Sequence, residues 1–373
     1  MKKLCFVTAA RSEYGLLKWL MRDVAASDAF ELQLIVTGGH LMRSQGYTVE
    51  QIREDGFSID VEVKVSPEQD TRGSLAACMG KMAEGMAMAL EQLQPDALVI
   101  LGDRYELLPI CNTAYVMEIP IIHLSGGDVT EGAMDNGIRN AVTMLTTYHF
   151  PGTEDSAENI RRMRGTEDNV WAVGEPGLDA FHREQMLERE VLAADLGLDA
   201  EKKWILMTYH PETKRTVESN LETIRNCCKA LAEADGIQVV MTYANADPGG
   251  SQINELLEET AGKDGDKFKV IPSLGKRYLS MMKEATLVIG NSSSGIVEAP
   301  SLSIPVVNIG DRQRGRHLCS NIVSCGITYE EIRQALDQAL DQALKQKVDT
   351  SDLSYWGDGN TAERILEILK EQL

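Results

Sequence analysis

Residues 97–106 read Ala-Leu-Val-Ile-Leu-Gly-Asp-Arg-Tyr-Glu, an apolar run that ends at a glycine and charged side chains. Similar short runs rich in Val, Ile and Leu recur along the chain, and longer amphipathic segments separate them. This alternation predicts an α/β fold in which helices cover both faces of a parallel sheet. Ligands of such sheets bind beyond the carboxyl ends of the strands, so the residues that follow each apolar run are the candidate site.

The apolar runs fall into two groups, which predicts two Rossmann-like domains facing a cleft. The predicted strands of the first group are Leu4–Thr8, Leu32–Val36, Ser58–Val63, Ala97–Leu101, Ile119–His123, Tyr148–Phe150 and Val170–Val173. Those of the second group are Trp204–Thr208, Ile237–Thr242, Lys267–Ile271, Thr286–Ile289 and Pro305–Ile309. We place the first domain at residues 1–175, the second at 176–355 and a C-terminal helical segment at 356–373.

The composition excludes several classes of function. The 373 residues include 37 Lys and Arg against 57 Asp and Glu, a net charge of −20, which argues against nonspecific binding to nucleic acid or to an acidic membrane surface. No stretch approaches the roughly 18 consecutive apolar residues of a membrane span. The seven cysteines are scattered without CxxC pairs. We therefore expect a cytoplasmic protein with reduced cysteines.

Charged side chains follow the strands of the first half. Arg11 opens a helix, whose free backbone N–H groups could hold an anion, although an ordinary turn with a solvated arginine is the alternative. Asp103 and Arg104 follow the run at 97–101 and suit proton transfer or anion binding, unless Asp103 only caps the helix expected near Tyr105. His123 ends the next strand and is a further acid/base candidate.

Two more carboxylates stand close behind His123. Asp128 follows a Gly-Gly pair, and Asp135 precedes Arg139 by four residues, a spacing that also fits a plain surface ion pair. Carboxylates that converge in a cleft raise one another's pKa, which makes one of them a usable acid or base near neutral pH. Three acids after consecutive strand ends therefore favour proton-transfer chemistry.

The second half supplies polar loops of another kind. His210 is the best acid/base candidate because only histidine titrates near neutrality unperturbed, although it could simply fill a turn. Ser292 and Ser293 lie in a small, hydroxylated loop that is suited to a diphosphate, and Glu298, one turn later, could bind ribose hydroxyls. Arg312 belongs to a local cluster of three arginines, which would focus an anionic ligand.

Taken together, the motifs resemble the UDP-N-acetylglucosamine 2-epimerase family, in particular its hydrolysing branch of sialic acid and legionaminic acid synthesis. The resemblance covers nearly the whole chain and rests on Arg11–Gly15, Leu101–Glu106, Gly126–Asp128, Asp135, Ile138–Arg139, His210–Glu212, Asn245–Asp247, Gly290–Gly295, Asn308–Gln313 and Gly357–Asn360. It implies a glycosyltransferase-B type fold whose last helix returns to the first domain. It also implies loss of UDP by elimination to a 2-acetamidoglycal, followed by hydration with inversion at C2.

The resemblance also assigns roles to residues. It implies four catalytic residues: Asp103, Asp128, Asp135 and His210. It implies a UDP site made of Arg11, Asn245, Ser292, Ser293 and Glu298. The weaker candidates are Arg104, His123, Arg139 and Arg312.

Three departures from the family pattern bear on the sugar. Asp128 replaces a common glutamate, Ser125 a histidine that often precedes it, and Asn140 the histidine of Ile-Arg-His. The leading hypothesis is a hydrolysing UDP-N-acetylglucosamine 2-epimerase that yields N-acetylmannosamine. The alternatives are a UDP-2,4-diacetamido-2,4,6-trideoxyglucose epimerase, a non-hydrolysing epimerase, a glycosyltransferase of the same fold and a nucleotide-sugar sensor.

Cofactors and partners complete the expectations. No GxGxxG or P-loop motif follows a strand, and no clustered His and Cys ligands stand in the sequence, so we expect neither a nicotinamide nor a metal. The expected partner is a UDP-sugar, without nucleic acid or membrane. A homo-oligomer, dimer or tetramer, is also expected.

Overall fold

The computed structural model describes the chain except for residues 44–45, 70, 130–134, 246–248 and 346–351. The described residues form two compact units. The first contains residues 1–129, 135–182 and 357–373, and the second contains residues 183–356. None of the described helices is long and apolar enough to cross a membrane.

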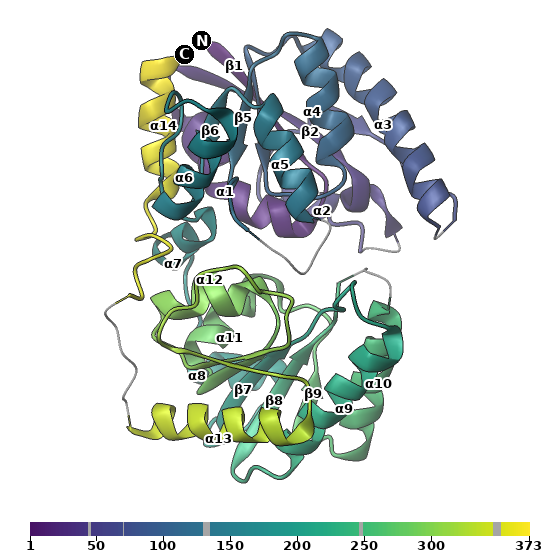
Figure 1. Cartoon of the computed structure of the whole chain (residues 1–373), viewed down its shortest axis with the longest axis vertical. Helices are drawn as coiled ribbons and strands as arrows, with labels where there is room; N and C mark the ends of the chain where they lie inside the picture. The colour runs from purple at the N-terminus through teal and green to yellow at the C-terminus, as the bar shows by residue number, and fades with distance from the viewer. Residues whose placement is uncertain (44–45, 70, 130–134, 246–248, 346–351) are drawn as a thin grey trace. The chain divides into compact units, whose positions relative to one another are not determined.

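The first unit is built on a six-stranded parallel sheet (Figure 1). Its strands are β1 (Lys2–Thr8), β2 (Phe30–Thr37), β3 (Val61–Val63), β4 (Ala97–Leu101), β5 (Ile121–Leu124) and β6 (Tyr148–Phe150). They lie in the order β3-β2-β1-β4-β5-β6, which is the order of a Rossmann sheet. The chain order reverses between β1 and β4, so the loops after these two strands flank the topological switch point.

Helices cover both faces of this sheet, as the alternating sequence pattern predicted. They are α1 (Arg11–Ala26), α2 (Val49–Glu54), α3 (Arg72–Leu93), α4 (Leu107–Val116), α5 (Asp135–Leu145), α6 (Glu154–Arg164), α7 (Ala180–Arg183) and α14 (Thr361–Gln372), with 3-10 turns η1 (Gly38–Leu41) and η3 (Pro176–Asp179). Apolar side chains of α3, α4 and α5 share one buried cluster with one face of the sheet. Helices α1 and α14 pack against each other.

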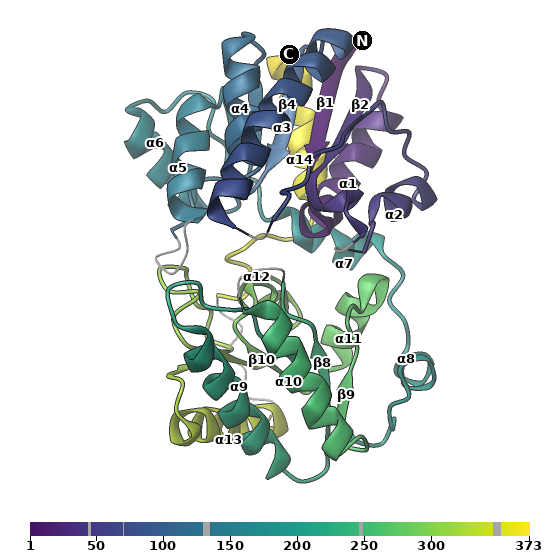
Figure 2. The same cartoon turned by 90° about the vertical axis from the view of Figure 1, so that its right-hand side faces the viewer.

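The second unit repeats this topology (Figure 2). Its strands are β7 (Lys203–Thr208), β8 (Ile237–Thr242), β9 (Phe268–Val270), β10 (Leu287–Gly290), β11 (Val306–Ile309) and β12 (Ile322–Cys325). They are parallel, in the order β12-β11-β10-β7-β8-β9, so β7 and β10 flank this switch point. The helices are α8 (Arg189–Leu196), α9 (Val217–Ala232), α10 (Gly250–Lys263), α11 (Tyr278–Glu284), α12 (Ser293–Ser301) and α13 (Tyr329–Lys345), with the 3-10 turn η4 (Gly275–Arg277).

Two apolar clusters hold the helices of the second unit to its sheet. One cluster joins α9, α10 and α13 to one face, and the other joins α8, α11 and α12 to the opposite face. The predicted glycosyltransferase-B type architecture, with two Rossmann-like sheets each covered on both faces, is confirmed.

The first unit keeps the segment at 176–182, which the sequence had placed in the second domain. The reason is a buried side chain: Asp179 accepts hydrogen bonds from the backbone N–H groups of Thr361 (2.8 Å) and Ala362 (2.7 Å) at the start of α14. The Asp179 carboxylate therefore binds both amides at a helix N-terminus, where negative charge is favourable. This contact ties η3 and α14 to the same unit.

One predicted strand is absent, and one strand of the structure was not predicted. Val170–Val173 forms only an isolated bridge between Val170 and His149, because Pro151, at the end of β6, has no N–H group with which to continue the ladder. The edge strand β12 was missed because its side chains are only partly buried and include Ser324, which blurs the apolar signal.

Candidate active site

Several candidate residues follow the strands that flank the two switch points. In the first unit, the loops after β1 and β4 carry Arg11, Asp103 and Arg104. In the second unit, the loops after β7 and β10 carry His210 and the serine-rich turn that begins α12. Chain reversal at these points leaves room at the sheet edge for a ligand. We describe each unit by itself.

Arg139 contacts two of the candidate residues of the first unit, Asp103 through its carboxylate and Asp128 through its backbone. Its side chain is 1% exposed, its Nη2 forms an ion pair with Asp103, and its Nη1 donates to the backbone oxygen of Asp128 at 2.6 Å. The reading of Arg139 as a surface residue is therefore wrong. So is the reading of Asp103 as a helix cap, because α4 begins only at Leu107, with Glu106 as its N-cap.

The other two carboxylates occupy defined positions near this arginine. Asp128 is 9% exposed, and its Oδ1 accepts a hydrogen bond from the Ser156 hydroxyl at 2.7 Å. Asp135 is half-buried and is the first residue of α5, the helix that also carries Arg139. Asp103 follows β4, Asp128 follows β5, and Asp135 begins the helix that comes next in the chain.

His123, one of the weaker candidates, lies inside the first unit. It is fully buried, and its Nε2 donates to the backbone oxygen of Gly102 at 2.7 Å. Burial lowers the pKa of His123 to about 4, so the ring is neutral at physiological pH. Its hydrogen bond fixes the glycine that precedes Asp103.

Two backbone N–H groups just before α1 are occupied by a side chain of the helix itself. The carboxylate of Glu13 accepts from the backbone N–H groups of Ala9 (2.7 Å) and Ala10 (3.2 Å), so the chain's own side chain occupies these two amides. Burial raises the pKa of Glu13 to about 7, which the nearby Arg104 and the two amide donors oppose. Arg104 also donates twice to the buried Glu106 (2.8 and 3.1 Å). Arg11 lies exposed at the start of α1.

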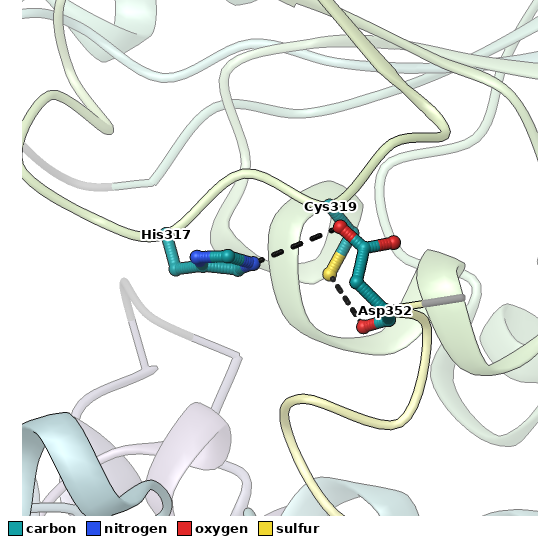
Figure 3. Close-up of side chains that lie close together, drawn as sticks. All are labelled: His317, Cys319 and Asp352. Carbon is teal, nitrogen blue, oxygen red and sulfur yellow. Dashed lines mark hydrogen bonds and ion pairs between the residues drawn. The ribbon is translucent and has the colours of Figure 1, made fainter. Parts of the chain in front are cut away.

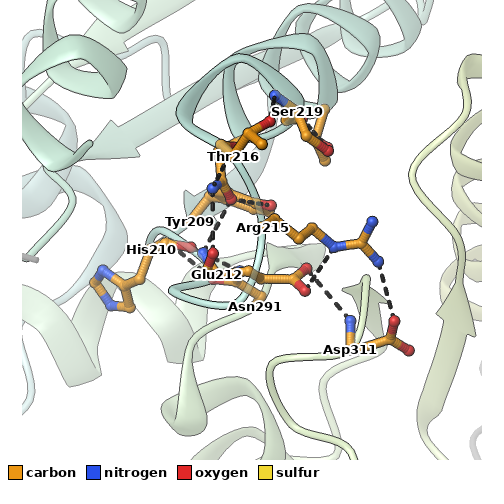
Figure 4. A network of polar contacts seen from close by, with 10 residues as sticks. Tyr209, His210, Glu212, Arg215, Thr216, Ser219, Asn291 and Asp311 are labelled. Carbon is orange, nitrogen blue, oxygen red and sulfur yellow. Dashed lines mark hydrogen bonds and ion pairs between the residues drawn. The ribbon is translucent and has the colours of Figure 1, made fainter. Parts of the chain in front are cut away.

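In the second unit, Asn291 anchors the loop of His210 (Figure 4). Its Oδ1 accepts from the His210 N–H at 2.7 Å, and its Nδ2 donates to the His210 carbonyl at 2.8 Å. The His210 Nδ1 accepts from the backbone N–H of Asn245 at 3.1 Å. Burial, followed by the charge of Arg312, lowers the pKa of His210 to about 3. The ring is therefore neutral and carries its proton on Nε2.

The turn into α12 requires its small residues. Gly290 has a φ of 138°, and a Cβ there would lie 1.9 Å from the Thr208 carbonyl oxygen, so only glycine fits. Ser292 is the N-cap of α12 and Ser293 is its first, exposed residue. This places backbone N–H groups and hydroxyls at the positive end of a helix dipole, where a phosphate is favoured.

Glu298 lies one turn further along α12. Burial raises its pKa to about 7, and its Oε2 is buried without a hydrogen-bond partner among the described residues. A buried carboxylate oxygen without a partner is costly, and a ligand hydroxyl would satisfy it. This is the chemistry that a ribose supplies.

The backbone carbonyl of Asn291 also positions the loop that contains Arg312. The Asn291 carbonyl accepts from Arg312 Nη1 (3.1 Å) and Gln313 Nε2 (2.8 Å). The buried Glu212 accepts from Arg215 at 2.8 Å and from the Asp311 N–H at 3.3 Å (Figure 4). These bonds tie the loops after β7, β10 and β11 into one network.

Within the described ranges, one group has metal-ligating side chains at close range: His317, Cys319 and Asp352, whose donor atoms all lie within 4.8 Å of one another (Figure 3). Burial and the charge of Asp352 raise the pKa of Cys319 to about 11, and the thiol donates a hydrogen bond to the Asp352 carbonyl oxygen at 3.5 Å. The Asp352 carboxylate already accepts from the Ser320 hydroxyl at 2.7 Å. We interpret the group as a polar link between residues 317–320 and 352.

Three residues of these networks were not singled out by the sequence. Asn291 stood within the quoted Gly290–Gly295 motif and Glu13 within Arg11–Gly15, but nothing local showed that their side chains bind backbone groups. Ser156 lies three residues after Thr153, a helix-start pattern that says nothing of its contact with Asp128.

Comparison with known proteins identifies the family. The family model described as UDP-N-acetylglucosamine 2-epimerase matches residues 22–370. A Campylobacter jejuni "GDP/UDP-N,N'-diacetylbacillosamine 2-epimerase (hydrolyzing)" is 34% identical over 92% of this chain and 89% of the relative. A Legionella pneumophila "UDP-N,N'-diacetylbacillosamine 2-epimerase (hydrolyzing)" is 33% identical over 99% and 96%.

A solved structure shares the fold. The Neisseria meningitidis UDP-GlcNAc 2-epimerase bound to UDP-GlcNAc superposes with a TM-score of 0.83, at 17% identity, over 99% of this chain and 100% of that one. The sequence motifs, the paired Rossmann-type sheets and the match of the family model lead to one conclusion. The chain belongs to the UDP-N-acetylglucosamine 2-epimerase family.

Proposed function

We propose that the protein is a hydrolysing 2-epimerase of a UDP-2-acetamido sugar and releases UDP together with the free C2 epimer. The observation that carries the proposal is the buried Arg139, which holds Asp103 and the backbone of Asp128 at neighbouring strand ends. Inversion at C2 by proton removal and return needs two proton-transfer groups, one for each face of the sugar. A pair of fixed carboxylates meets this need.

The second unit supplies what a departing UDP requires. The C2 proton of a 2-acetamido sugar is not acidic, so its removal depends on advanced cleavage of the C1–O bond and positive charge at C1. Negative charge then develops on the diphosphate, where preorganised donors are most effective. The neutral His210, with its proton on Nε2, Arg312 and the N-terminus of α12 are such donors. Glu298 would accept from the ribose hydroxyls.

The sugar that we propose carries a second acetamido group at C4 and no hydroxyl at C6. Both hydrolysing relatives, at 34% and 33% identity, are named for N,N'-diacetylbacillosamine, which is a 2,4-diacetamido-2,4,6-trideoxy sugar. The departures at Ser125, Asp128 and Asn140 are on the side of the site expected to meet the sugar. UDP-N-acetylglucosamine, the leading sequence hypothesis, becomes the second candidate.

The test is turnover of purified protein with each UDP-sugar, followed by NMR. We expect free UDP and a free C2-epimeric sugar, with a higher kcat/KM for the 2,4-diacetamido substrate. Epimerised UDP-sugar without free UDP would instead identify a non-hydrolysing epimerase, and tight binding without turnover would identify a sensor. Action in the cytoplasm and a dimeric or tetrameric state are also part of the proposal, and light scattering measures the latter.

A further inference from the structure

Three helices of this protein begin with the same pattern, a threonine N-cap followed three residues later by a serine. They are α3 with Thr71 and Ser74, α6 with Thr153 and Ser156, and α9 with Thr216 and Ser219. In each, the serine N–H donates to the threonine Oγ1 at 3.2 Å. This bond uses only the serine backbone, so helix capping explains the threonine and leaves the serine hydroxyl unexplained.

The hydroxyl of Ser156 has a contact that helix capping does not require. Ser156 is 4% exposed, and its Oγ donates to Asp128 Oδ1 at 2.7 Å while it accepts from the Thr153 hydroxyl at 2.9 Å. Two hydroxyls therefore form a chain that ends on a carboxylate of the candidate site. The Ser74 hydroxyl, in contrast, accepts from the backbone N–H of Gln69 at 3.0 Å.

The backbone around Asp128 is shaped for this contact. Gly127 has a φ of 83°, and a Cβ at this position would lie 2.2 Å from the Ser156 carbonyl oxygen, so only a glycine lets the loop approach α6 this closely. Asn159, one turn further along α6, donates to the Gly127 carbonyl at 3.1 Å. The loop is thus bound to α6 twice, through the Asp128 side chain at Ser156 and through the Gly127 backbone at Asn159.

A second helix, α5, holds the backbone of Asp128. Arg139 of α5 donates to the Asp128 carbonyl oxygen at 2.6 Å. The main chain of Asp128 is therefore held by α5, and its carboxylate is held by α6. A proton-transfer group must keep its geometry within a fraction of an ångström, and an aspartate on a loop gains that precision from such supports.

We propose that Ser156 is a positioning residue for proton transfer: its hydroxyl orients the Asp128 carboxylate toward C2 of the sugar. The inference rests on the proposed function. It extends the site to α6, which none of the sequence motifs includes. The Thr153 hydroxyl supports the arrangement by donating to Ser156, so that the Ser156 proton points at the carboxylate.

The experiment compares Ser156→Ala with Ser219→Ala, which changes the same helix position in α9. In the described part of the chain, the Ser219 hydroxyl makes no hydrogen bond to a candidate carboxylate. We expect Ser156→Ala to lower kcat roughly 10- to 100-fold, as befits one hydrogen bond to a charged group. KM and the affinity for UDP, measured by calorimetry, should hardly change. Ser219→Ala should keep wild-type kcat.

Two further variants separate positioning from a general loss of structure. Ser156→Thr keeps the hydroxyl and should recover most of the lost kcat. In an Asp128→Asn background, Ser156→Ala should have little further effect, because it acts through that carboxylate. The inference is wrong if Ser156→Ala has wild-type kcat, or if it lowers kcat equally in the wild-type and Asp128→Asn backgrounds. Either result would leave the proposed function standing. A wild-type enzyme that turns over neither UDP-sugar would overturn the proposed function and this inference together.

Discussion

His210 shows how its surroundings change the chemistry of a single residue. Its type predicts an acid or base near neutral pH, because an unperturbed histidine titrates there. In the structure, burial lowers its pKa to about 3, and the N–H of Asn245 occupies its Nδ1. The ring is then a fixed hydrogen-bond donor through Nε2, which suits a leaving phosphate better than it suits proton transfer.

This difference can be measured with two amide variants. A glutamine at position 210 places its amide nitrogen near the position of Nε2, whereas an asparagine places it near Nδ1. We expect His210→Asn to weaken UDP binding about 10-fold or more, as for the loss of a hydrogen bond to a charged group. His210→Gln should weaken it less. Equal losses in the two variants, in calorimetry with UDP, would argue against donation from Nε2.

The three acids of the first unit make a second prediction at this scale. Asp103→Asn, Asp128→Asn and Asp135→Asn should each lower kcat about 10²-fold or more, because each removes a proton-transfer group. Asp103→Asn should also lower the melting temperature, since it removes the carboxylate that forms an ion pair with the buried Arg139. Steady-state kinetics and thermal melts check both points. If one of these variants turns over at the normal rate, the aspartate that it replaces has no catalytic role.

Helix α12 shows the effect of an element on its residues. The turn that begins it is fixed by Gly290, by the Ser292 cap and by the Asn291 bonds to His210, so the N–H groups at its start are set before any ligand arrives. The same helix buries Glu298 with one oxygen unsatisfied. In the absence of ligand, the buried, unsatisfied carboxylate of Glu298 lowers the stability of the protein, and the start of α12 is already arranged for binding.

The burial of Glu298 predicts that the folding stability of the ligand-free protein depends on pH. The pKa of Glu298 rises from 4.5 to about 7 on folding, so its contribution to stability is full below pH 4.5 and is lost as the pH rises to about 7. Above pH 7, ligand-free Glu298→Gln should therefore melt at a higher temperature than the wild type. The difference should vanish below pH 4.5. The exposed Glu222→Gln, on α9, should show no such pH-dependent gain.

At the scale of the whole molecule, the proposed chemistry predicts the fate of one hydrogen. A glycal must regain hydrogen at C2 from solvent, delivered by a protein acid. Turnover in D₂O should therefore give a free sugar with one deuterium at C2, which NMR and mass spectrometry detect. Protium retained at C2 would rule out the elimination mechanism and would fit direct hydrolysis or glycosyl transfer.

The metal requirement is also a property of the whole molecule. Among the described residues, His317, Cys319 and Asp352 form the one group of possible metal ligands. The thiol of Cys319 has a pKa of about 11 and already donates to the Asp352 carbonyl oxygen. We expect activity to survive exhaustive dialysis against EDTA. Activity that is lost on dialysis and restored only by a divalent cation would contradict this. Cys319→Ala would then show whether the cation binds at this group.

The sequence by itself determined the two parallel sheets and the strand ends at which the candidate residues stand. Apolar runs such as 97–101 and the polar residues behind them are local features, and strand periodicity with chain order is enough to place Asp103 and His210 at strand ends. The motif Gly290–Gly295 likewise placed a turn and a helix start after a strand, where the structure has the beginning of α12.

Only the tertiary structure decided what those residues can do. Burial and contacts between distant segments set the charge state of His210, the pairing of Asp103 with Arg139 36 residues away, and the hold of Ser156 on Asp128. The segment at 176–182 joined the first unit through Asp179 and the distant α14. Local sequence carries none of this, since desolvation and hydrogen bonding depend on neighbours that only folding brings together.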